Sequence, residues 1–163
     1  VLIRSDISER ENSLRGVAHS AGVQNYAFFQ NAGYRGMYNM DLYRIRQIKN
    51  IPSNRSPLDF MGRQEMAANL FRLAETEAKI KNDNIRGQGR LEQTAQAIGE
   101  RVRQTMIELS GTRPEYLPTA PDIKQVHTSL KKTQREFGKL DGKRKKREPL
   151  SPDDKQLTID SAN

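Results

Sequence analysis

Apolar residues recur along this chain at intervals of three and four, the spacing that places side chains on one face of an α-helix. The clearest stretch is 90–110, where the steps between apolar positions are four, three, four, four and three: Leu91, Ala95, Ile98, Val102, Met106 and Leu109. No run of useful length alternates between apolar and polar residues, as a half-buried strand would. The pattern therefore predicts an all-α protein.

Start and stop signals divide the chain into about six helices in a single irregular helical domain. We expect them at about 5–21, 25–33, 40–50, 57–81 and 90–110, with a last helix from about 122. Capping side chains are available at Ser5, Asn25 and Ser56, and Gly111 can close the fifth helix. We interpret Gly33 and Gly36 as framing a turn after the second helix.

The composition limits the classes of protein to consider. Hydrophobic residues make up 34% of the 163 residues and charged residues 29%, so we expect a modest core with long solvated helices or a disordered end. No apolar run approaches the roughly 20 residues that span a bilayer, and a membrane partner is not expected. The start lacks the pattern of a signal peptide, and cysteine is absent, so we expect a cytoplasmic protein without disulfides. Because the first residue is Val1, the chain is interpreted as a fragment or the product of an alternative start.

Positive charge is concentrated near the C-terminus. The net charge is +8, and residues 131–147 hold nine Lys or Arg against two acidic residues, whereas residues 1–130 hold 18 and 14. We therefore predict a helical domain at 1–141 and a disordered basic tail at 142–163. An end-loaded charge of this kind is typical of an arm that binds a polyanion.

The strongest candidate nucleic-acid-binding residues lie in this region. Five adjacent cations can replace counterions on a phosphate backbone without reading bases: Lys143, Arg144, Lys145, Lys146 and Arg147. Cations on the last helix would assist them: Lys131, Lys132, Arg135 and Lys139. The alternatives are a solvated tail that only maintains solubility, and a nuclear-localisation signal, which the motif alone also matches.

A second candidate is an aromatic-rich segment. Six of the ten aromatic residues fall within 26–43, interleaved with Arg and Lys, a mixture that single-stranded nucleic acid can use for base stacking. Tyr34 and Arg35, at the predicted turn, are the candidate stacking site. The competing interpretation assigns these aromatics to the core, with Phe28 and Phe29 inside.

The sequence contains no recognisable catalytic, metal-binding or nucleotide-binding motif. His19 and His127 lack helical partners for a metal ion, and no nucleophile motif surrounds a Ser or Thr. The Gly-containing turns lack the features of a phosphate-binding loop. We therefore expect no enzymatic activity, no catalytic residues, no cofactor and no metal.

Several segments together resemble the C-terminal half of the DNA-damage-inducible protein D family. The most specific is 62–79, which reads GRQEMAANLFRLAETEAK, and 29–38, 102–105 and 108–112 accompany it in order. The resemblance runs from about Gly16 to Lys131. It implies a bacterial protein of the SOS response to DNA damage, connected with DNA repair. It also implies action on recombination intermediates or on a RecA-type recombinase filament.

The chain departs from the family in two respects. Family members carry an N-terminal domain similar to the phage antirepressor (BRO-type) module, which is thought to bind DNA and which this sequence does not include. The basic tail after Gly142 exceeds the family pattern and could supply DNA affinity instead. The resemblance offers no catalytic residues.

We expect a non-enzymatic DNA-damage response protein that binds single-stranded or duplex DNA without sequence preference, or modulates recombination intermediates, near the nucleoid. The first alternative is a protein-interaction module that docks on a recombinase filament or forms a homo-oligomer. The second is an enzyme that lacks an N-terminal partner segment.

Overall fold

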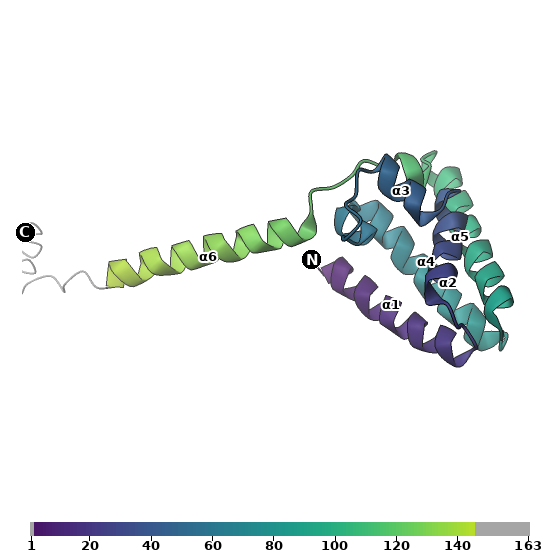
Figure 1. Ribbon diagram of the computed structural model, residues 1–163. Coiled ribbons are helices and arrows are strands. Elements are labelled where there is room, and N and C mark those ends of the chain that lie inside the picture. Colours follow the sequence, from purple (N-terminus) through teal and green to yellow (C-terminus); the bar gives the residue numbers. More distant parts are fainter. Residues whose placement is uncertain (1, 146–163) are drawn as a thin grey trace, which may run out of the picture. The chain divides into compact units, whose positions relative to one another are not determined.

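The computed structural model describes residues 2–145, and all regular structure in that range is helical. It contains six α-helices (Figure 1): α1 (Leu2–Ser20), α2 (Tyr26–Tyr38), α3 (Leu42–Ile48), α4 (Arg63–Asn82), α5 (Gln88–Ser110) and α6 (Ile123–Lys145). Two short 3-10 helices, η1 (Pro57–Phe60) and η2 (Pro114–Tyr116), lie in the connections. The predicted all-α class with six helices is confirmed.

Tertiary contacts divide the chain into two units, Val1–Ile123 and Lys124–Asn163. The boundary predicted at 141 therefore falls inside the second unit. Helix α6 continues to Lys145, so residues 142–145 of the tail predicted to be disordered are helical. The rest of the predicted tail, 146–163, lies outside the described residues.

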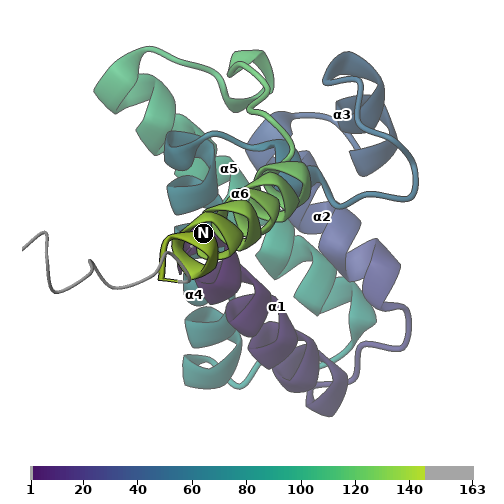
Figure 2. The same cartoon turned by 90° about the vertical axis from the view of Figure 1, so that its left-hand side faces the viewer.

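The first unit is built from two pairs of helices (Figure 1 and Figure 2). Helix α1 lies along α4, where Ser13 donates a hydrogen bond to Glu77 over 3.0 Å. Helix α2 lies along α5, and α5 also contacts α4. The side chain of Gln88 holds the ends of the second pair together, because it accepts hydrogen bonds from the backbone N–H groups of Gln24 and Asn25 at 2.8 and 3.1 Å. The core lies between the two pairs.

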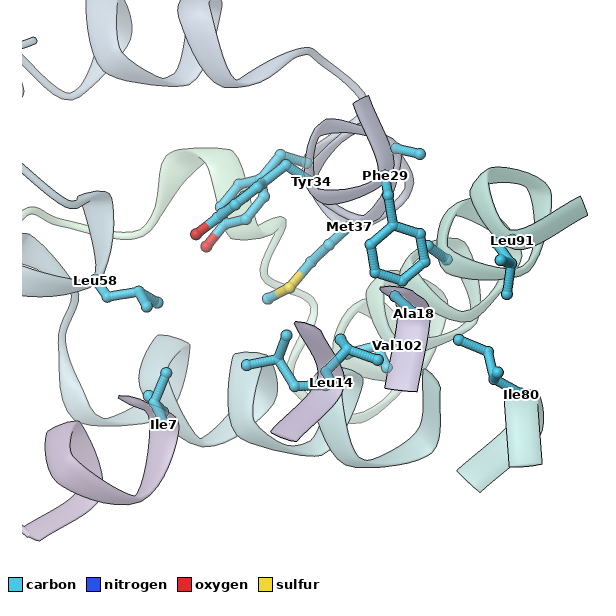
Figure 3. Packing of buried hydrophobic residues seen from close by; sticks show 14 of the residues in the cluster. Ile7, Leu14, Ala18, Phe29, Tyr34, Met37, Leu58, Ile80, Leu91 and Val102 are labelled. Atoms are coloured by element: carbon cyan, nitrogen blue, oxygen red, sulfur yellow. The ribbon is translucent and has the colours of Figure 1, made fainter. Parts of the chain in front are cut away.

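Apolar faces from all four long helices of this unit meet in one cluster. Figure 3 shows the positions where they converge: Ile7, Leu14, Ala18, Phe29, Tyr34, Met37, Ile80, Leu91 and Val102. Leu58 from η1 closes one end of the cluster. Not every apolar residue of the periodic stretch at 90–110 faces the core. Leu91, Val102 and Met106 are buried, but Leu109 is 83% exposed.

The turn predicted at Gly33 and Gly36 is wrong. Helix α2 runs without interruption to Tyr38, and its glycines allow close contact with α5. A Cβ atom on Gly36 would collide with the carbonyl oxygen of Gln96, and one on Gly99 would lie 2.6 Å from the carbonyl oxygen of Gly33. These glycines therefore serve helix packing, because they bring two backbones together without side chains between them.

The local signals at helix ends were read correctly in several places. Asn25 caps α2 and accepts a hydrogen bond from the N–H of Phe28. Ser56 caps the short η1 and not a helix at 57–81 as predicted, because α4 begins only at Arg63. Ser5 does not cap the first helix, since α1 already begins at Leu2. Gly111 closes α5 in the left-handed conformation, with φ of 68°. The chain after α5 returns to η1, where Ala120 donates a backbone hydrogen bond to Phe60 over 2.8 Å and Asp122 pairs with Arg55.

Candidate nucleic-acid interface

Helix α6 carries the candidate cations that the structure describes in full. The side chains of Lys131, Lys132, Arg135 and Lys139 are all exposed. The backbone of Lys143, Arg144 and Lys145 continues the same helix. Lys146 and Arg147, the last two cations of the predicted run, lie outside the described residues.

The four exposed cations share one face of α6. Lys131, Arg135 and Lys139 follow one another at steps of four, and Lys132 is adjacent, so all four project within a sector of about 100° around the helix axis. The apolar residues of the helix lie on the other side: Val126, Leu130 and Phe137. The helix thus presents a continuous row of positive charge about 12 Å long from Lys131 to Lys139, which can contact several phosphates at once.

The predicted stacking site at Tyr34 and Arg35 is not formed. Tyr34 lies in the middle of α2 and is 1% exposed, with its ring 5.0 Å below the guanidinium group of Arg72. Burial raises the pKa of its hydroxyl well above the ordinary value. Arg35 is exposed, because the next residue of a helix projects about 100° away. A base could not reach the face of Tyr34, so the pair cannot act together.

Other members of the aromatic segment do reach the surface. Phe28, which we expected inside, is 63% exposed, and Tyr43 on α3 is 70% exposed. Phe29 and Tyr38 are buried. The aromatic-rich segment is therefore mainly core, as the competing interpretation stated.

A buried row of polar residues on α4 was missed in the sequence. Glu65, Asn69, Arg72 and Thr76 are each no more than 3% exposed. Their spacing of four, three and four is the same as that of apolar core residues, and this was the signal that could have located them. All four belong to the segment that carries the family resemblance. The distinctive part of that segment is thus an internal polar layer.

Hydrogen bonds connect this layer to three other parts of the body. Glu65 accepts a hydrogen bond from the Tyr38 hydroxyl at 2.6 Å and pairs with the Lys49 ammonium group at 3.1 Å. Lys49 also donates to the carbonyl oxygen of Leu117 at 3.0 Å. The layer therefore holds α2, the end of α3 and the segment after η2 against α4.

Electrostatics inside the layer follow from burial. Desolvation raises the pKa of the Glu65 carboxyl above its ordinary value, although the hydrogen bonds from Tyr38 and Lys49 act in the opposite direction. Further along α4, burial also raises the pKa of Glu77, but the hydrogen bonds from Lys81 and Ser13 outweigh it and leave that pKa below its ordinary value. Both carboxyls are enclosed by their partners, as expected of structural groups.

The described residues contain no arrangement that suggests metal chemistry, because His, Asp and Glu side chains nowhere gather in groups of three or more suited to an ion. None of the helices in residues 2–145 combines the length and apolar character that a bilayer span requires.

Fold and surface together define an all-α protein with a compact helical body and a cationic helix. A profile of the DinD C-terminal domain family matches residues 1–126. The chain belongs to this family, which confirms the resemblance noted in the sequence.

A curated relative supports the same assignment. The chain is 41% identical over 140 residues to DNA damage-inducible protein D of Escherichia coli (strain K12), an alignment that covers 83% of this chain and 51% of the relative. The chain thus spans about half the length of the curated relative that it matches. No solved structure matches the chain.

Proposed function

We propose that this protein acts in the response to DNA damage as a non-enzymatic protein that binds nucleic acid through helix α6. Two findings support the first part: membership of the DinD C-terminal domain family and 41% identity to a protein named for its induction by DNA damage. The proposed outcome of binding is to modulate recombination intermediates.

The observation that carries the nucleic-acid proposal is the cationic face of α6. Its four side chains are exposed, and no ion pair within the described residues engages them. Phosphates attract such cations regardless of base sequence, because counterions released from the backbone drive the association. Binding would therefore be strongly salt-dependent and would show little sequence preference.

The test is fluorescence anisotropy of labelled single-stranded and duplex DNA across a salt series. One variant carries Gln at Lys131, Lys132, Arg135 and Lys139. A matched control carries Gln at four exposed arginines of the body, which removes the same charge: Arg63, Arg90, Arg101 and Arg113. The α6 variant should bind more weakly, and its slope of log affinity against log salt should fall by up to about 3.6 for duplex or 2.8 for single strands.

The control separates a defined interface from a general effect of net charge. It should retain most of the affinity and salt slope of the original chain. Equal losses in both variants would mean that only total charge matters, and the assignment to α6 would be abandoned. Absence of binding by the original chain at moderate salt would refute the nucleic-acid proposal itself.

A second candidate function is docking on a recombinase filament. A groove of about 760 Å³ lies between α1 and α4, with Leu70 and Phe71 in its lining, and Phe71 is 55% exposed. Exposed apolar surface of this kind is typical of protein-binding sites. Co-sedimentation with a RecA-type filament should be lost in a Phe71→Glu variant and retained in a Glu75→Gln variant of the same helix.

A further inference from the structure

Helix α6 repeats apolar residues with a period of seven. The steps between Ile123, Val126, Leu130, Thr133, Phe137 and Leu140 are three, four, three, four and three, and Thr133 is the one polar residue among them. This is the spacing of the a and d positions of a coiled coil, where Ile123, Leu130 and Phe137 are at a. We call these six positions the seam of α6.

Three apolar side chains of the seam are exposed to solvent. Val126, Leu130 and Phe137 are 44%, 54% and 63% exposed. Helix α6 contains glycines at 138 and 142, which lower its intrinsic stability. Most of the stability of helices in proteins comes from packing of an apolar face, so burial of the seam would stabilise α6. The family profile ends at residue 126, and most of the seam lies beyond it.

The four exposed cations of α6 lie away from the seam, as they must if two copies of the helix are to pair along it. Lys131, Lys132, Arg135 and Lys139 occupy the b, c and f positions, which face away from a coiled-coil partner. The flanking e and g positions between Val126 and Lys139 whose side chains the structure describes are Ser129, Gln134 and Glu136. Two copies of the helix can therefore approach along the seam without bringing these four cations together.

The charge pattern also selects a direction. In a parallel pair, Glu136 at g would lie next to Asp141 at e of the other copy, and the basic runs at 143–145 of the two helices would lie side by side. An antiparallel pair places these runs at opposite ends. In that register Val126 meets Phe137 of the second copy, and Leu130 meets Thr133.

We propose that α6 is a self-association helix through which two copies of this chain form an antiparallel pair along the seam. This inference goes beyond the proposed function and does not depend on nucleic-acid binding. The pair would present the cationic faces of both helices outward.

The first test measures the mass of the full chain by sedimentation equilibrium without nucleic acid. The mass should rise with concentration from 18.6 kDa toward twice that value. A variant with Leu130→Gln and Phe137→Gln should remain at 18.6 kDa, whereas the control with Lys132→Gln and Lys139→Gln should associate like the original chain. Near-UV circular dichroism of the buried Tyr34 and Tyr38 should be unchanged in both, which shows that the body is folded.

A second test reports the direction of pairing. The chain has no cysteine, so Gln125→Cys allows one spin label for each copy. In the antiparallel pair the two labelled positions are offset by 13 residues, about 20 Å along the axis, whereas in a parallel pair they lie at the same height. A distance near that of two adjacent helices would overturn the antiparallel arrangement. A constant mass of 18.6 kDa at all concentrations, or equal association by the seam variant, would overturn the proposal as a whole.

Discussion

Single glycines set the distance between α2 and α5. The two backbones lie in close contact at Gly36 and Gly99, because any Cβ atom at either position would meet main-chain atoms of the other helix. Gly16 on α1 is a natural comparison, because it is also helical but exposed, and a Cβ there would meet nothing within 4 Å. The same substitution should therefore have opposite effects at Gly36 and Gly16.

We predict that Gly36→Ala lowers the free energy of unfolding by about 1–3 kcal/mol, since overpacked cores shift backbone and side chains. Gly16→Ala should raise it by about 0.5–1 kcal/mol, because alanine loses less conformational freedom in a helix. Urea unfolding followed by far-UV circular dichroism measures both. An unchanged midpoint for Gly36→Ala would show that the helices separate without cost and that the close contact is not needed.

At the scale of elements, the buried pair of Lys49 and Glu65 connects α3 to α4. Their side chains are 4% and 1% exposed, and their charged atoms lie 3.1 Å apart. Two buried charges are costly to desolvate, but removal of one partner is worse because the other remains uncompensated. The intact pair therefore adds little to the free energy of unfolding, but a variant that lacks one partner is strongly destabilised.

We predict that Lys49→Met destabilises the protein by about 3–5 kcal/mol and that adding Glu65→Gln restores part of this loss. Burial already raises the pKa of Glu65, and without Lys49 that pKa should rise further. A carboxyl whose folded-state pKa is raised is favourable below its unfolded-state pKa, and this benefit is lost as pH rises through the folded-state pKa. The Lys49→Met variant should therefore lose stability from mildly acidic to neutral pH.

A double-mutant cycle by urea unfolding at two pH values measures these terms. The single Glu65→Gln variant completes the cycle and keeps the Tyr38 contact possible. Additive effects of the two substitutions would contradict the coupling and would mean that Lys49 and Glu65 act independently.

At the scale of the whole molecule, the compact unit should fold without α6. The buried core residues and the apolar residues packed against them lie between Ile3 and Leu117. Beyond these, Ala120 bonds to Phe60 of η1 and Asp122 pairs with Arg55. We predict that a fragment of residues 1–122 unfolds cooperatively and keeps the near-UV signal of Tyr34 and Tyr38.

A fragment that ends at Arg113 provides the comparison. It lacks Glu115, which pairs with Arg103, and Leu117, whose carbonyl oxygen accepts from Lys49. Its thermal midpoint should be lower than that of residues 1–122. If the longer fragment is itself unfolded, the division of the chain into two units does not describe independent folding.

Much of the secondary structure could be predicted because its signals are local. Asn25, Ser56 and Gly111 act on backbone groups within a few residues of themselves. A glycine, in contrast, can either end a helix or allow two helices to pack closely, and the sequence around it does not distinguish the two. The sequence signal at Gly33 suggested a helix end, but a Cβ atom there would collide with the guanidinium group of Arg72 on α4, 39 residues later.

The candidate nucleic-acid interface was also predictable only where its residues depend on local sequence. The cations of α6 could be located from sequence, because exposed charge on a solvated helix depends on helical periodicity alone. Tyr34 could not be placed, since its environment is made by Arg72 of another helix. The same reason explains why Glu65 and Asn69 were missed.

The amino-acid pattern was therefore sufficient for the helical class, for several caps and for the positive face of α6. Tertiary structure decided which polar residues are buried and which glycines are contacts between helices. The physical reason is the sequence distance between the interacting groups. Helix formation and capping involve neighbours in sequence, whereas Glu65 is buried by Tyr38, Lys49 and other groups that come together only when the chain folds.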